Sequence, residues 1–164
     1  MKNLFFLTLV MFFAFLSCRS GEESVQKIDQ VIKLYIDSAG QDMLNAKLSG
    51  SYVFTSMNDV YGLTDNAPVS VSIKKNSDTI NYIEYLAGAK RIGIDSSGSM
   101  KIYESKIALR LTKKIHDSNR VTNDTMTIQY QSTPNLFQVA KIWYNGTLQF
   151  TKVEGQSNTV KIVK

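Results

Sequence analysis

The chain has 164 residues, a formal net charge of +5 at pH 7 and a pI of about 9.2. This length suits one domain with a core of its own. The basic residues are scattered, whereas a nucleic-acid-binding surface would gather them on one face together with aromatic side chains. Two prolines, nine glycines and the lack of a low-complexity tract argue against a long disordered linker. We therefore expect one globular domain with no nucleic-acid partner.

The first residues have the pattern of a secretory signal peptide. Lys2 precedes an apolar run over residues 4–16, and the small residue Ser17 follows it. The run is shorter than the roughly 20 residues that a transmembrane helix needs. We predict a cleaved signal peptide over residues 1–17, with an uncleaved amino-terminal anchor helix as the alternative.

Cys18 is the only cysteine of the chain, so it has no partner for an internal disulfide. Phe15-Leu16-Ser17-Cys18 resembles a bacterial lipobox, in which the signal peptide is cut before a cysteine that carries lipid. Phe15 departs from the leucine that is usual there. Each buried methylene of an acyl chain contributes about 0.8 kcal/mol, and stable anchoring takes more than one chain. The resemblance implies a lipid-anchored protein; a free or buried thiol is the alternative.

Residues 18–30 are expected to be the lipidated cysteine and its polar tether. Glu22 and Glu23 resemble the acidic export signal that follows the lipidated cysteine in surface lipoproteins of Bacteroidota, although they start four residues downstream. A solvated tether without an export signal is the other interpretation.

Residues 31–164 predict a single all-β domain, because short runs of alternating apolar and polar residues are separated by turn residues. Residues 78–88 fit either a helix or a strand. The expected strands cover residues 31–36, 69–73, 91–94, 100–103, 107–111, 126–130, 137–144 and 147–153, and residues 52–54 and 60–63 are short strand candidates. This pattern predicts an Ig-like, antiparallel β-sandwich of about 7–9 short strands, with a small β-barrel as the alternative.

Asn145-Gly146 between two such runs is a strong hairpin signal, because a type I′ turn needs two residues with positive φ. This turn pairs Trp143 with Leu148, and an uninterrupted ladder then sets Lys141 opposite Phe150. We predict that three side chains face the core, Trp143, Leu148 and Phe150, and that Ile142 and Tyr144 lie on the other face. A ligand-stacking role for Trp143 is the less favoured alternative.

Three elements resemble uncharacterised putative lipoproteins of Bacteroidota. They are a D-x-x-G-x-D-x-L-N element over residues 37–45, the segment from Thr122 to Ile128, and a K-x-W-Y-N-G-x-L element over residues 141–148. Residues 48–120 have no counterpart in this resemblance. It implies a lipid-anchored, exported, Ig-like module and offers no catalytic residues.

Asp followed by Ser or Thr and an apolar residue resembles the O-glycosylation sites of Bacteroidota. Ser38, Thr79 and Thr125 fit this pattern, although each preceding aspartate also suits a turn or the start of a strand. We predict glycans on these three hydroxyls. A native protein whose intact mass equals that of the bare lipidated chain would exclude them.

Catalytic constellations are not evident. His116 is the only histidine and no G-x-S-x-G elbow accompanies it, while a metal site built from histidine and cysteine needs more ligands than the chain has. Sequence does not place a pair of carboxylates among Glu84, Glu104 and Glu154. We expect no catalytic residue, no cofactor and no metal.

These observations predict a lipoprotein anchored in the outer membrane through lipid on Cys18. It would act as a non-catalytic binding or structural module at the cell surface, with a protein or glycan partner. The alternative is a periplasm-facing lipoprotein that binds a protein, such as an immunity or envelope-stabilising factor.

Overall fold

The computed structural model describes residues 25–115 and 118–164, in which all regular structure is β. Its twelve strands are β1 (Lys27–Asp29), β2 (Ile32–Ser38), β3 (Gln41–Asp42), β4 (Tyr52–Asp59), β5 (Val71–Lys75), β6 (Asn81–Tyr85), β7 (Ile92–Ser97), β8 (Met100–Ile115), β9 (Ser118–Ser132), β10 (Leu136–Tyr144), β11 (Thr147–Thr151) and β12 (Asn158–Val163).

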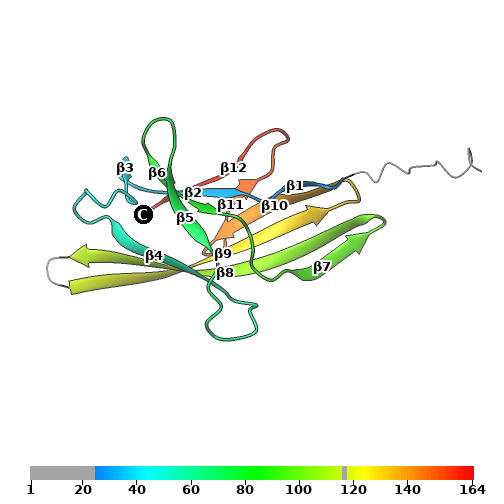
Figure 1. The fold of residues 1–164 in the computed structure, drawn as a ribbon, viewed down its shortest axis with the longest axis horizontal. Coiled ribbons are helices and arrows are strands. Elements are labelled where there is room, and N and C mark those ends of the chain that lie inside the picture. Colours follow the sequence, from blue (N-terminus) through cyan, green and yellow to red (C-terminus); the bar gives the residue numbers. More distant parts are fainter. Residues whose placement is uncertain (1–24, 116–117) are drawn as a thin grey trace, which may run out of the picture.

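The strands form two sheets that lie as two layers (Figure 1). The larger sheet has the order β1-β10-β9-β8-β4, with β11 also on β10 and β7 also on β8. The smaller sheet has the order β12-β2-β6-β5, with β3 also on β2. Most neighbours are antiparallel, whereas β1 with β10 and β12 with β2 are parallel. The predicted β-sandwich is confirmed, and the sheets of the described residues do not close into a barrel.

Several predicted elements differ from the observed ones. The runs at 100–103 and 107–111 belong to one long strand, β8, and residues 81–85 of the ambiguous segment form a strand. The strand predicted at 60–63 is wrong, because the carboxylate of Asp59 accepts a hydrogen bond from Tyr61 N at 2.9 Å and turns the chain there. The sequence pattern predicts no strand at the position of β12.

The ordered fold begins before residue 31, where we expected it. Residues 27–29 of the predicted tether form β1 and pair with Leu136–Gln138 of β10. The chain then passes through Gln30 and Val31 into β2 of the other sheet. The start of the domain is therefore part of both layers.

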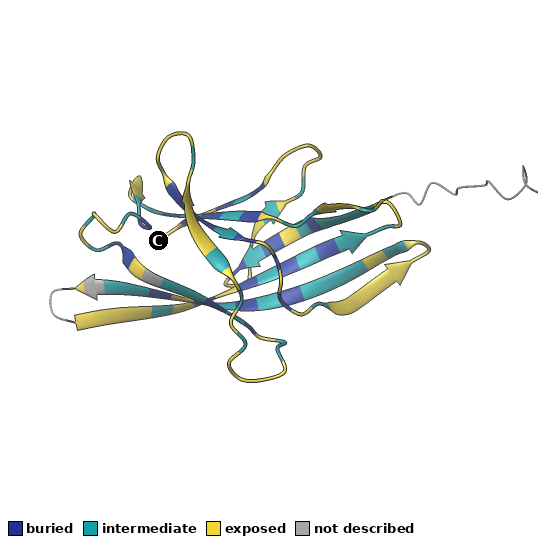
Figure 2. Cartoon of the chain, in the orientation of Figure 1, coloured by how far each residue is buried: buried dark blue, intermediate teal, exposed yellow. Residues whose placement is uncertain are grey.

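The core lies between the sheets and is made by one face of each central strand. Figure 2 shows the buried segments in the middle of the sandwich and the exposed ones at loops, at β7 and at the ends of β8 and β9. Full burial of one such aliphatic side chain contributes about 1.5–3 kcal/mol. The central strands place these fully or almost fully buried side chains in the core: Ile32, Leu34, Ile36, Ile107, Leu109, Leu111, Met126, Ile128 and Tyr130.

The β10–β11 hairpin has the predicted turn but the opposite orientation. Asn145 and Gly146 have φ values of 48° and 81°, and Trp143 pairs with Leu148 as predicted. However, Ile142 and Tyr144 are buried in the core, whereas Trp143 is half-buried on the other face and Leu148 is 48% exposed. Only Phe150 of the three predicted core residues packs against the core.

Two bulges account for this difference. In the pair of β10 and β11, Leu148 lies opposite Trp143 but Phe150 lies opposite Ile142, so Phe150 does not lie opposite Lys141. In β10 the pairing with β9 skips Ala140. A bulge adds one residue to one strand and shifts its alternation, so Val139 before Ala140 and Ile142 after it can both face the core. A regular alternation read from the sequence places the wrong side chains inside.

Candidate functional site

The outer face of the larger sheet presents Trp143 to solvent. The register places Leu148, Trp143, Thr127 and Lys106 in one row across four strands. The next row contains Thr151, Lys141, Gln129 and Glu104. Neighbouring strands lie about 4.8 Å apart, and residues two positions apart on a strand are separated by roughly 6.6 Å. An indole ring therefore lies among hydroxyl, amide and ammonium groups on one sheet surface.

The charges of this face are mainly positive. Lys106, Lys141 and the exposed Arg110 point outward, because their neighbours in sequence or in register fill the core. Glu104, the carboxylate of these two rows, accepts a hydrogen bond from the Tyr61 hydroxyl at 2.7 Å. That hydrogen bond raises the pKa of Tyr61 above its ordinary value.

A groove adjoins this face along the edge of β10 where β1 ends and β11 begins. It consists of two neighbouring hollows of about 470 Å³ each, which share Leu136, Gln138, Lys152 and Glu154 in their lining. The groove exists because β1 pairs with Leu136–Gln138 and β11 pairs further along the same edge, beyond the bulge at Ala140. Lys141 and Thr151 line the second hollow as well as the outer face, so groove and face are continuous.

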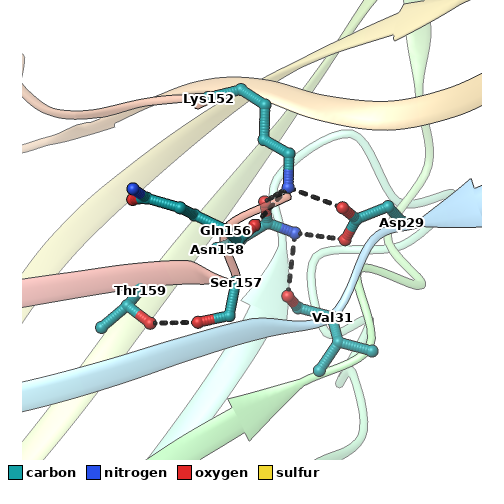
Figure 3. Close-up of polar contacts among 7 residues, drawn as sticks. All are labelled: Asp29, Val31, Lys152, Gln156, Ser157, Asn158 and Thr159. Carbon is teal, nitrogen blue, oxygen red and sulfur yellow. Dashed lines mark hydrogen bonds and ion pairs between the residues drawn. The ribbon is translucent and has the colours of Figure 1, made fainter. Parts of the chain in front are cut away.

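Three polar side chains form hydrogen bonds with one another beside the groove (Figure 3). The Lys152 ammonium donates to Asp29 Oδ2 at 2.6 Å, to the Gln156 carbonyl at 2.6 Å and to Asn158 Oδ1 at 2.9 Å. Asn158 Nδ2 donates to Asp29 Oδ1 at 2.9 Å and to the Val31 carbonyl at 3.0 Å. We call Asp29, Lys152 and Asn158 the polar clamp. It connects β1, the loop after β11 and the start of β12.

The polar clamp is built for structure rather than for chemistry. All three ammonium hydrogens of Lys152 have acceptors, and both oxygens of Asp29 accept a hydrogen bond. Asn158 is fully buried. Together these three side chains connect the two sheets beside the groove.

Two of the elements singled out in the sequence, residues 122–128 and 141–148, meet around Asp124, which is 4% exposed. Its carboxylate accepts hydrogen bonds from the Tyr144 hydroxyl at 2.8 Å, from Asn145 Nδ2 at 2.7 Å and from Lys164 Nζ at 2.5 Å. Asn145 Oδ1 in turn accepts from Thr125 N at 2.8 Å. Burial alone would raise the pKa of Asp124, but these hydrogen bonds outweigh it and lower the pKa. Burial and the bond to Asp124 raise the pKa of Tyr144.

The element at residues 37–45 joins the same region through its backbone. Lys164 N donates to the Asp37 carbonyl at 2.8 Å, and the Asp37 carboxylate accepts from Gly40 N at 2.9 Å. Asp42 Oδ2 accepts from the Asn81 amide groups and so fastens β3 to β6. These residues fix turns and strand ends, which is a structural role for the motifs.

The predicted modification sites lie in different surroundings. Cys18 lies outside the described residues. Thr79 and Thr125 are exposed, with Thr79 in a loop at a φ of 63°, whereas the half-buried Ser38 donates its hydroxyl to the Lys164 carbonyl at 2.6 Å. A glycan on Ser38 would break that hydrogen bond. Glycosylation of all three stays a prediction.

The candidate catalytic groups do not come together. His116 lies outside the described residues. Glu84 pairs with Lys74 at 2.5 Å on the smaller sheet, Glu104 lies on the larger sheet and Glu154 is exposed beside the groove. Within residues 25–115 and 118–164, no cluster of three or more His, Cys, Asp or Glu side chains could hold a metal ion. In the same ranges no helix has the length and hydrophobicity to cross a membrane.

Comparisons with known proteins add no relative. A scan against protein-family models gives no match, and searches of curated proteins and of solved structures give none either. The outer face and the groove were not found from the sequence, because both depend on the bulges in β10 and β11.

Replacement of Asn158 by Ala should lower the free energy of unfolding by about 2–3 kcal/mol, because it removes a fully buried amide together with its hydrogen bonds to Asp29, Val31 and Lys152. Urea unfolding measures this loss. Gln156→Ala is the matched control in the same loop, since only its backbone carbonyl binds Lys152. An equal effect of both replacements would show that the polar clamp does not stabilise the fold.

Asp124→Asn should lower the free energy of unfolding at pH 7. The difference in this free energy between the variant and wild type should become smaller as the pH falls. The folded protein holds the pKa of Asp124 below its ordinary value of about 3.9, so its stabilising contribution is complete above that pH and is lost as the pH falls through the folded pKa. Urea unfolding of both proteins from pH 7 to pH 3 measures the difference. A difference that stays constant over this range would contradict the lowered pKa.

Proposed function

We propose that this protein is a non-catalytic binding module of the bacterial cell envelope, anchored in the outer membrane by lipid on Cys18 and exposed at the cell surface. The observation that carries the binding role is the outward position of Trp143 in a row of polar and cationic side chains. Burial would stabilise a tryptophan in the core, so a sheet that holds it at the surface has an indole available for a partner.

The anchor is supported by the lipobox-like residues 15–18 and by the lone cysteine. The strand formed by the last part of the predicted tether, β1, lies at the end of the molecule opposite the end of β8 and the start of β9 (Figure 1). A tether attached at that end leaves the long outer face of the larger sheet accessible.

A non-catalytic role is supported by how the ionisable groups are used. Asp29, Asp124 and Glu84 each have a lysine partner, and Glu104 binds Tyr61. An acid or base catalyst needs a carboxylate or imidazole positioned to exchange a proton with a substrate.

The alternative is a lipoprotein that faces the periplasm and binds a protein. It would have the same fold but lie on the other side of the outer membrane. Protease treatment of intact cells separates the two, because only a surface protein is cleaved from outside.

Cys18→Ala should abolish lipid attachment and release the protein from the membrane. Incorporation of radiolabelled palmitate, membrane fractionation and protease shaving of intact cells give the three readouts, and Ser20→Ala is the matched control that keeps the cysteine. Wild type is expected to be labelled, membrane-bound and shaved. A labelled but protected wild type would replace the surface role by the periplasmic one. Unchanged processing and membrane retention of Cys18→Ala would refute the anchor.

A further inference from the structure

We propose that the outer face of the larger sheet binds an acidic polysaccharide. Trp143 stacks on a sugar ring, and Lys106 and Lys141 pair with carboxylate or sulfate groups of the chain. This inference rests on the proposed binding role and names the chemical class of its ligand.

Trp143 has the properties of a sugar-stacking residue. It is half-buried, so the sheet fixes its ring while part of the ring stays open. The indole Nε1 has no hydrogen-bond partner within the described part of the chain. The apolar C–H face of a pyranose covers an aromatic ring well, and the indole N–H then serves a hydroxyl at the rim.

The cations of the face are unpaired and lie at two sides of the indole. Lys141 is two residues from Trp143 on β10, roughly 6.6 Å along the strand, and Lys106 is two strands away, roughly 10 Å. Among the ion pairs of residues 25–115 and 118–164, none involves Lys106, Arg110 or Lys141. Unpaired ammonium and guanidinium groups around an aromatic ring complement an anionic polymer.

Neutral polar groups fill the space between the cations. Thr127 lies between Trp143 and Lys106, and Gln129 lies between Lys141 and Glu104. The side-chain amides of Gln129 and Gln138 have no partner in the described residues, and Gln138 continues the surface into the groove. Amides and hydroxyls both donate and accept hydrogen bonds, as sugar hydroxyls require.

Other ligand classes fit this face less well. Single-stranded nucleic acid is bound by several aromatic rings on which successive bases stack, whereas the two rows contain one aromatic ring. The centre of a protein–protein interface is apolar and has few charges. In these two rows the large apolar side chains are Leu148 and Trp143, and the other side chains are polar or charged.

The outer face of the smaller sheet provides a matched control. It also has tyrosines and lysines, but Tyr35 and Tyr82 contact each other with ring centroids 5.3 Å apart, and Lys33 lies 5.6 Å above the Tyr82 ring. Lys161 on β12 is exposed on the same side. Since these aromatic rings contact one another or a lysine, the double replacement Tyr35→Ala/Lys161→Gln should leave polysaccharide binding unchanged.

The test uses full-length, lipidated protein in detergent and affinity electrophoresis through gels that contain alginate, a polyuronate. Dextran is the neutral polysaccharide, and a competing oligo(dT) strand tests nucleic acid. Wild type is expected to be retarded by alginate and not by dextran. Trp143→Ala and the double replacement Lys106→Gln/Lys141→Gln should each weaken the alginate interaction about tenfold, with the control variant within about twofold of wild type.

The proposal is overturned if neither alginate nor chondroitin sulfate retards the wild type, if dextran retards it equally, or if oligo(dT) abolishes alginate binding at equal mass. It is also overturned if Trp143→Ala binds like wild type while its urea unfolding midpoint is unchanged. Membrane attachment is measured separately by the Cys18→Ala experiment, so loss of the anchor and loss of the polysaccharide ligand are distinguishable.

Discussion

Burial of Ile142 and Tyr144 between the two sheets determines which side chains the larger sheet presents to solvent. Successive side chains of a strand point to opposite faces, so the residue between these two, Trp143, has to lie outside. The bulge at Ala140 makes this arrangement compatible with Phe137 and Val139, which use the core face on the other side of the bulge. The same bulge separates β1 from β11 along β10 and so opens the groove that Lys141 lines. Core packing and candidate binding surface thus share one cause.

Two long-range polar clusters keep the sandwich closed around this core. The polar clamp joins residues 123 and 129 positions apart in sequence, from Asp29 to Lys152 and to Asn158. The cluster around Asp124 ties the hairpin turn at Asn145 to Lys164. Both clusters connect strand ends, where a sheet provides few backbone hydrogen bonds. Most polar atoms of both clusters have hydrogen-bond partners. Such clusters stabilise because breaking them leaves buried groups unpaired.

Local sequence signals predicted much of the fold. The Asn145-Gly146 turn, the alternation of residues 126–130 and the strand at 31–36 depend on near neighbours, and the structure has all three elements. The candidate site could not be predicted in the same way. A bulge has no distinctive residue here, since Ala140 and Gln149 would suit a regular strand equally well. The short strand β1 depends on pairing with residues over a hundred positions away, which no local pattern reveals.

The parallel pairings between the two ends of the chain determine the order in which the sheets can be completed. β1 pairs with β10 and β2 pairs with β12, so both amino-terminal strands need partners from the carboxyl-terminal third. Contacts of this sequence separation form late, because a long loop must close first. A chain made from its amino terminus therefore leaves β1, and the edge of β2 that faces away from β6, without a strand partner until β10 and β12 are available. Each sheet is completed on one side only by the carboxyl-terminal third of the chain.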